Sequence, residues 1–324
     1  MGIERFIESH DGTKIYTNTS GEGPTLVLCD GLGCEGFIWK HFRERFGATH
    51  RIVHWNYRGH GLSHCPEDYE RLTTDDLIED LRQVLEQLDI NNAVLCGHSM
   101  GVQLILEFAY RYPEKVAGLL PMCGSYGRPL ETFHDGPLLG IAFPFLRELV
   151  FKSPRRAQWV WSNANKNELA FQFAMISEVN SKAVNGDDFR PYFEHLAGMD
   201  IGVFIRVLDS VSRHTVEDHL PLIKAPTLIV AAEHDTFTPA WLSQHMRHQL
   251  PDAELLTVEG GTHIAPIEFP ELIHRRVEPF LRKCFAATAA KPKKRTRRKK
   301  APATDIAHAN PPESQPLAAD GTQA

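Results

Sequence analysis

Three residues far apart in the sequence could together perform nucleophilic catalysis. Ser99 lies in the segment Gly97-His98-Ser99-Met100-Gly101, and Asp235 and His263 each directly follow a later apolar run. A serine hydroxyl is a weak nucleophile at neutral pH, so it needs a base to take its proton and a carboxylate to orient that base. These residue types favour attack by Ser99, with His263 as the base and Asp235 as the group that orients it.

The segment around Ser99 predicts a sharp turn from a strand into a helix. The apolar run at 93–96 is typical of a buried strand, and residues 102–110 carry apolar side chains at helical spacing. Such a reversal needs small flanking residues, which Gly97 and Gly101 supply. The hydroxyl would then stand at a helix N-terminus, where free N–H groups favour negative charge. An ordinary glycine turn is the alternative interpretation.

The rest of the chain must bring these residues together. Alternation on both sides of His10-Asp11-Gly12 predicts an N-terminal hairpin. Further along, strand-like runs alternate with longer runs of helical spacing, which implies a parallel sheet. Residues that follow parallel strands can meet at the carboxyl edge of the sheet. Strands are predicted at 25–29, 51–55, 93–96, 116–123, 226–232 and 253–258, and a final helix from Pro270 to about Phe285.

Residues 125–215 interrupt this rhythm and predict a helical cap. The region mixes Gly and Pro turns with apolar and aromatic runs, and it contains no convincing strand. Helical character is expected at 138–151, 159–161, 169–179 and 189–208. We therefore predict a core formed by 1–124 and 216–286, the cap at 125–215, and a tail at 287–324 whose composition predicts disorder.

These motifs resemble the α/β-hydrolase family, whose nucleophile elbow has the pattern Gly-x-Ser-x-Gly between a strand and a helix. The resemblance covers about residues 3–285 and includes the turn Asp30-Gly31-Leu32-Gly33 and the Arg-Gly-x-Gly loop at 58–61. It implies a mostly parallel eight-stranded sheet with helices on both faces and a helical cap. It also implies a triad in the order Ser99, Asp235, His263, working without a metal or cofactor.

Attack on a carbonyl creates an oxyanion that needs preorganised N–H donors. The elbow supplies the backbone N–H of Met100, and the resemblance indicates that of Leu32 as the second. The family usually has His-Gly at this turn, whereas this chain has Asp30. A carboxylate facing the oxyanion would oppose catalysis. We therefore expect Asp30 to turn away and bond to backbone or to a nearby basic group, unless burial raises its pKa instead.

The substrate pocket is predicted between the sheet edge and the cap. Its candidate lining residues are Asp30, Gly31, Gly33, His98, Trp159, Trp161 and Phe143. The cap aromatics would equally suit the cap's own core. An apolar lining favours a small hydrophobic acyl substrate with an ester bond.

We therefore expect a serine hydrolase, of the carboxylesterase or lipase type, that cleaves a carboxylic ester, thioester or lactone through an acyl-enzyme. Serine at position 99 argues against the dehalogenase and epoxide-hydrolase branches of the family, which carry aspartate there. The same triad leaves carbon–carbon-bond hydrolases, cofactor-free perhydrolases and acyltransferases open.

Composition bounds the class of protein. With 324 residues, 42% of them hydrophobic, the chain can bury a sizeable core, and no run approaches the roughly 18 apolar residues of a membrane span. The charged N-terminus does not resemble a secretion signal. Six separated cysteines suggest buried thiols in a reduced compartment, which favours the cytoplasm. The group His54, His60, His64 and Cys65 matches no zinc spacing, so we expect no metal.

A basic run lies near the end of the chain. Eight of the ten residues from Lys291 to Lys300 are Lys or Arg. Such a run could neutralise the phosphates of nucleic acid or polyphosphate, or bind an anionic surface. It therefore raises an alternative function, that of a binding protein tethered to a polyanion or granule. A tail that only increases solubility is the simpler interpretation.

Overall fold

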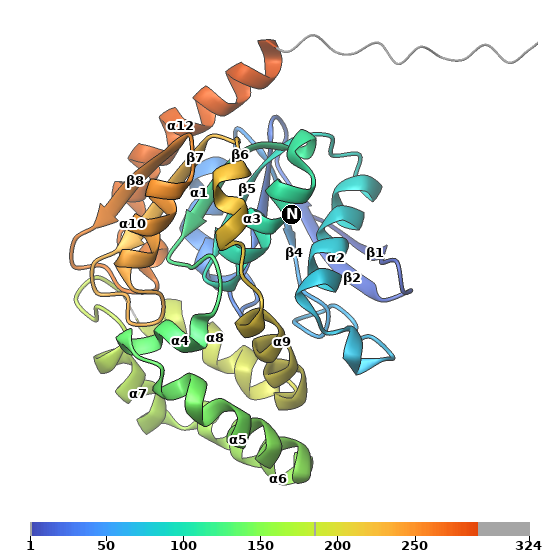
Figure 1. Ribbon diagram of the computed structural model, residues 1–324, viewed down its shortest axis with the longest axis vertical. Coiled ribbons are helices and arrows are strands. Elements are labelled where there is room, and N and C mark those ends of the chain that lie inside the picture. Colours follow the sequence, from blue (N-terminus) through green and yellow to red (C-terminus); the bar gives the residue numbers. More distant parts are fainter. Residues whose placement is uncertain (1, 185, 291–324) are drawn as a thin grey trace, which may run out of the picture. The chain divides into compact units, whose positions relative to one another are not determined.

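The computed structural model describes residues 2–184 and 186–290. Its centre is an eight-stranded sheet in the order β1-β2-β4-β3-β5-β6-β7-β8 (Figure 1). Strands β3 to β8 pair in parallel, and β2 is antiparallel to both neighbours. The predicted mostly parallel sheet is therefore confirmed. The strands are β1 (Ile3–Glu8), β2 (Lys14–Ser20), β3 (Thr25–Cys29), β4 (Arg51–Trp55), β5 (Ala93–His98), β6 (Val116–Met122), β7 (Thr227–Ala232) and β8 (Ala253–Val258).

Burial along the strands explains their sequence patterns. Every residue of β5, β6 and β7 is buried, because central parallel strands are covered on both faces and therefore need near-continuous apolar runs. The hairpin strands β1 and β2 lie at the edge and expose most of their residues at least partly. Gly12, with φ of +85°, closes the predicted hairpin turn by donating its N–H to the Ser9 carbonyl at 3.0 Å.

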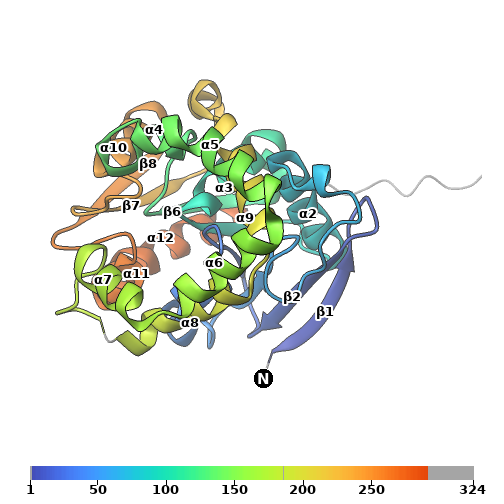
Figure 2. The same cartoon turned by 90° about the horizontal axis from the view of Figure 1, so that it is seen from below.

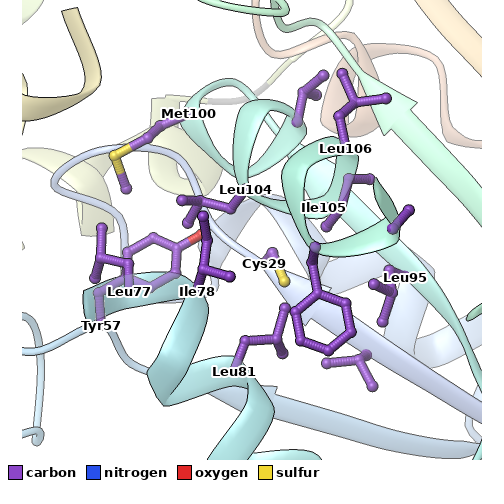
Figure 3. Close-up of a cluster of buried hydrophobic side chains, with 14 of the residues drawn as sticks. Cys29, Tyr57, Leu77, Ile78, Leu81, Leu95, Met100, Leu104, Ile105 and Leu106 are labelled. Carbon is purple, nitrogen blue, oxygen red and sulfur yellow. The ribbon is translucent and has the colours of Figure 1, made fainter. Parts of the chain in front are cut away.

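Helices cover both faces of the sheet and create a hydrophobic core on each side. Apolar residues of α2, α3 and α10 belong to one core, and those of α1, α11 and α12 to the other. Figure 3 shows part of the first core, a cluster that includes Leu77 and Leu81 of α2, Leu104 and Ile105 of α3, and the strand residue Leu95. These helices are α1 (Lys40–Phe46), α2 (Thr74–Gln87), α3 (Met100–Arg111), α10 (Ala240–Gln249), α11 (Ala265–Glu268) and α12 (Pro270–Ala290).

A helical insertion, residues 125–215, lies between β6 and β7 beyond one end of the sheet (Figures 1 and 2). A single antiparallel bridge between Gly127 and Thr215 joins its two ends. The helix predicted over 189–208 is instead two helices, because Asp200 caps the second by accepting hydrogen bonds from Gly202 and Val203 N–H. The insertion comprises α4 (Pro129–Thr132), α5 (Leu138–Lys152), α6 (Pro154–Lys166), α7 (Glu168–Ser177), α8 (Gly186–Gly198) and α9 (Ile201–Arg213).

Short 3-10 helices connect several of these elements. They are η1 (Phe37–Trp39), η2 (Tyr69–Arg71), η3 (Pro113–Lys115), η4 (Phe133–Asp135) and η5 (Glu217–Leu222).

The last helix extends further than expected. Helix α12 continues to Ala290, whereas the tail was predicted to begin at residue 287. The run of alanines after Phe285 explains the difference, because alanine has the highest helix propensity. Residues 291–324, which contain the basic run, lie outside the described part of the chain.

The Arg-Gly-x-Gly loop is anchored by a buried ion pair. The Arg58 guanidinium is fully buried and donates to both carboxylate oxygens of Asp80, at 2.6 and 2.7 Å. It also donates to Asp11 at 2.9 Å and to the Arg71 carbonyl at 2.8 Å. A buried guanidinium needs such partners to offset its lost hydration. The loop is therefore held in place beside the carboxyl end of β4.

Candidate active site

Ser99 stands on the turn between β5 and α3 in a conformation that few residues adopt. Its φ and ψ are 54° and −118°. The Ser99 N–H donates to the carbonyls of Met122 and Cys123 at the end of β6, both at 3.1 Å. These bonds hold a strained backbone in place at the edge of the sheet, and strain of this kind is typical of functional sites.

Two glycines allow this turn to pack closely. A Cβ on Gly97 would lie 2.5 Å from the Gly101 carbonyl oxygen, and a Cβ on Gly101 would lie 2.2 Å from that of Cys29. Neither contact is sterically possible without backbone movement. The Gly-x-Ser-x-Gly pattern thus reflects close approach between the turn, its own helix and the end of β3.

The two other predicted residues meet Ser99 at this edge. Asp235 follows β7 and His263 follows β8. The Ser99 hydroxyl lies 2.9 Å from His263 Nε2, and His263 Nδ1 lies 3.0 Å from both carboxylate oxygens of Asp235. Proton transfer from the hydroxyl to the imidazole is therefore geometrically feasible, while the carboxylate orients the ring.

Asp235 is buried and remains an acceptor. Besides His263, it accepts hydrogen bonds from Phe237 N–H at 3.0 Å, and from the N–H and hydroxyl of Thr238 at 2.8 Å each. Burial alone would raise the pKa of Asp235, but the interactions with His263 and Thr238 outweigh it and hold the pKa below its usual value. Asp235 thus stays ionised beside His263 at neutral pH.

Two residues that fix the His263 loop were not predicted from the sequence. Buried Glu268 accepts hydrogen bonds from the N–H and hydroxyl of Thr262, both at 2.7 Å. The Phe237 ring stacks on the His263 ring at 4.8 Å between centroids. Glu268 comes from the short helix α11 after the loop, and Asp-x-x-Thr at 235–238 was the one local signal of a turn that bonds back to its own carboxylate.

His98 braces the same loop from the elbow. Its buried Nε2–H donates to the His263 carbonyl at 2.9 Å, which leaves Nδ1 unprotonated and without a partner among the described residues. Burial, with a smaller effect from His263, lowers the pKa of His98 to about 3. His98 is therefore a neutral acceptor beside the cavity.

The two predicted oxyanion donors line the same cavity. Met100 is the first residue of α3, so its N–H has no acceptor within the helix. The Leu32 N–H makes no hydrogen bond with another described residue. Gly31, which precedes Leu32, comes so close to Ser99 that a Cβ on Gly31 would lie 3.1 Å from the Ser99 Cβ.

Asp30 turns away from the cavity and binds a basic residue. Its buried carboxylate accepts from His54 Nε2 at 2.7 Å and from Trp39 Nε1 at 2.6 Å, while Tyr57 donates to its backbone carbonyl at 2.7 Å. Burial alone would raise the pKa of Asp30, but His54 and then Trp39 more than compensate, so the pKa is lowered. Both oxygens of the carboxylate thus have hydrogen-bond donors where they lie, and Asp30 anchors the turn that carries Leu32.

The site opens into a cavity of about 550 Å³ between the sheet edge and the insertion, within the usual range for small-molecule sites. Ser99 and His263 lie on one wall, and apolar side chains of α5, α7, α8 and α9 form most of the rest. Representative apolar lining residues are Leu139, Phe143, Val150, Trp161, Val179, Phe189, Phe204, Ile205 and Leu208.

Three residues of the predicted lining require correction. Gly31, His98, Trp161 and Phe143 line the cavity, whereas Asp30, Gly33 and Trp159 do not. The Asp30 carboxylate is hydrogen-bonded to His54, and Gly33 packs against Leu196 and Phe204. The Trp159 side chain is 69% exposed, because a residue two positions from Trp161 faces the other side of α6.

Comparisons with known proteins find similar chains over most of this length. The model of the alpha/beta hydrolase family matches residues 26–276. The RutD protein of Azorhizobium caulinodans, whose name proposes carbamate hydrolysis, is 24% identical over 84% of this chain and 97% of its own length. Epoxide hydrolase 1 of Caenorhabditis elegans is 22% identical over 86% of this chain and 70% of its own.

Solved structures share the fold. A thermophilic esterase from Thermogutta terrifontis superposes with a TM-score of 0.71 at 21% identity, covering 87% of this chain and 99% of the esterase. The enol-lactonase from Burkholderia xenovorans gives a TM-score of 0.69 at 17% identity, covering 86% and 100% respectively.

Proposed function

The chain belongs to the alpha/beta hydrolase family, and from this premise we propose that it is a serine hydrolase of hydrophobic acyl esters, thioesters or lactones. One observation carries the proposal: the Ser99 hydroxyl lies 2.9 Å from His263 Nε2, with Asp235 on the opposite ring nitrogen, at the wall of an apolar cavity.

The proposed reaction runs through an acyl-enzyme. Ser99 Oγ attacks the substrate carbonyl carbon as its proton passes to His263 Nε2, and Asp235 stabilises the imidazolium. The negative oxygen of the tetrahedral intermediate is held by the N–H groups of Leu32 and Met100. Collapse of the intermediate breaks the ester bond, and His263 returns the proton to the leaving alcohol. Water, deprotonated by His263, then releases the acid and restores Ser99.

The lining of the cavity favours an apolar acyl group over a small polar substrate. A carbamate carbonyl could be attacked by the same triad, but its polar groups would be desolvated against a lining that is mostly apolar on α5, α8 and α9. Opening of an epoxide by direct attack needs a carboxylate as the nucleophile, whereas position 99 carries a serine. Esters with apolar acyl chains therefore fit the site better than the substrates named for these two relatives.

Turnover of p-nitrophenyl esters of increasing acyl length tests this function. We expect kcat/KM to rise as the acyl chain lengthens from acetate and then to fall once the cavity is filled. Ser99→Ala should reduce turnover by at least about a thousandfold, since it removes the nucleophile. Equal turnover by wild type and Ser99→Ala would refute the proposal. Asn163→Ala, at an exposed position of α6 outside the cavity lining, serves as the control.

A further inference from the structure

Helices α5 and α7 are apolar on more than one side. Ten of the fifteen residues of α5 are Leu, Ile, Val, Phe or Ala, and α7 contains Leu169, Phe171, Phe173, Met175 and Ile176 within ten residues. A helix that is apolar all round is normally covered all round. In the described part of the chain, one side of each helix faces the cavity or packs against the rest of the insertion. The other side is not covered by any described residue.

Their outward-facing side chains are more than half exposed. We call the following residues the outer apolar face; each is between 57% and 80% exposed: Leu138, Ile141, Phe145 and Leu149 of α5, Trp159 and Val160 of α6, and Leu169, Phe173 and Ile176 of α7. Helix α6 contacts both α5 and α7, and all three helices lie on the side of the insertion away from the sheet (Figure 1). Clusters of exposed large apolar side chains usually mark an interaction surface.

The same helices form the cavity wall. Leu139, Phe143 and Leu146 of α5 line the cavity from inside, while Ile141, Phe145 and Leu149 point outward. On α7, Ala174 lines the cavity and its neighbour Phe173 is exposed. One layer of helix therefore separates the outer apolar face from the acyl cavity.

The charges around this face differ in sign from those of the whole chain. Residues 138–177 carry five Lys and Arg against two Asp and Glu, whereas the full chain carries 35 against 41. Three of these cations, Arg155, Arg156 and Lys166, are exposed and form no ion pair with another described residue. An apolar face bordered by unpaired cations is complementary to a surface that is apolar inside and anionic outside.

We propose that the outer apolar face docks onto an anionic lipid surface, so that the enzyme takes its acyl substrate from that surface. The identity of the substrate rests on the proposed function, but the docking itself does not. No helix in residues 2–184 or 186–290 is long and apolar enough to cross a membrane, so the contact is peripheral. Exposed aromatic and leucine side chains enter the lipid boundary, and Arg155, Arg156 and Lys166 contact the headgroups.

A second copy of the chain fits this face less well. A symmetric dimer would place the same patch on both partners, so the unpaired cations of one copy would face those of the other. Anionic headgroups instead attract them.

Vesicle binding tests the proposal. The protein is the full chain with Ser99→Ala, so that binding is measured without turnover. The probes are vesicles of phosphatidylcholine alone and of phosphatidylcholine mixed with phosphatidylglycerol. We expect binding to the mixed vesicles that weakens with added salt. The pair Leu149→Ser and Leu169→Ser, both outside the cavity lining, should weaken it at least about tenfold.

A matched pair of substitutions serves as the control. Leu62 and Leu222 are also exposed, at 55% and 56%, but lie outside α5–α7. Leu62→Ser with Leu222→Ser should bind the mixed vesicles as tightly as the parent protein. In chains that retain Ser99, neither pair should change hydrolysis of a water-soluble ester by more than about twofold, since neither touches the cavity.

Three outcomes would overturn the proposal. One is no binding to the mixed vesicles. Another is binding that survives the Leu149 and Leu169 substitutions but disappears when the Lys and Arg residues of 291–300 are replaced by Gln, which would assign the contact to the basic run. The third is a dimer in sedimentation that the same leucine pair dissociates while vesicle binding is unchanged. If binding behaves as expected but ester turnover fails, the proposed function falls and the docking surface remains.

Discussion

At the scale of single residues, the oxyanion turn depends on a buried hydrogen-bonded pair. Asp30 and His54 lie 2.7 Å apart, and the Asp30 backbone carbonyl accepts from Tyr57. The residue types at 30–33 and 97–101 were enough to predict the turn, the elbow and an Asp30 that faces away. They did not identify the partner, because His54 comes from β4, and pairing across a sheet brings together residues that the sequence keeps apart.

Asp30→Asn tests this anchoring role. Asparagine has only one acceptor oxygen in its side chain, so it cannot accept from both Trp39 and His54, and the turn that carries Leu32 should become less fixed. We expect kcat to fall by about tenfold to a hundredfold with KM little changed, since a loosened donor acts mainly on the transition state. His54→Gln should cause a similar loss, and the double variant should be no worse than either single variant. Losses that simply multiply would show that the two residues act independently.

At the scale of elements, the hydrophobic periodicity of the sequence predicted which strands and helices form. Where each element ends depends also on tertiary packing and capping. The strands of the sheet and the hairpin at Gly12 were predicted because apolar runs and glycine turns are local signals. The division between α8 and α9 was missed, since apolar residues continue through 189–208 and the break depends on the cap made by Asp200. Trp159 was placed in the cavity because composition alone does not indicate which side of a helix faces inward.

Gly101→Ala tests how closely the elbow packs on β3. A Cβ at this position would lie 2.2 Å from the Cys29 carbonyl oxygen and 2.7 Å from that of Asp30. We expect the free energy of unfolding to fall by about 1–3 kcal/mol, and ester turnover to fall further because the Asp30 turn must move. In Gly198→Ala the new Cβ meets nothing within 4 Å, so both quantities should stay near wild type. Denaturant unfolding and ester assays measure both. If Gly101→Ala changed neither the free energy of unfolding nor ester turnover, the close packing of the elbow on β3 would be contradicted.

At the scale of the whole molecule, buried neutral histidines link stability to pH. Burial lowers the pKa of His60 to about 4, that of His98 to about 3 and that of His274 to about 4. In the unfolded chain a histidine titrates near pH 6.5. The unfolded state therefore binds more protons below that pH. No pattern in the sequence distinguishes these three among 17 histidines, because their burial is a property of the assembled fold.

The free energy of unfolding should accordingly decrease as pH falls from about 6.5 to about 4. Each buried histidine contributes up to about 1.4 kcal/mol per pH unit in that window. His60→Asn retains a donor for the Arg58 carbonyl and removes the titrating group, so its stability should depend less steeply on pH than that of wild type. Urea unfolding at a series of pH values measures both slopes. Parallel curves for the two proteins would contradict the assignment to His60.

We propose that Ser99, activated by His263 and Asp235, forms an acyl-enzyme. Mass spectrometry of the protein after treatment with a fluorophosphonate tests it most directly, since this reagent reacts with serines whose hydroxyl is activated by a neighbouring base. We predict one phosphonyl adduct, on the peptide that contains Ser99, that is absent in His263→Ala. An unmodified Ser99, or an adduct elsewhere in a protein that still hydrolyses esters, would contradict the account.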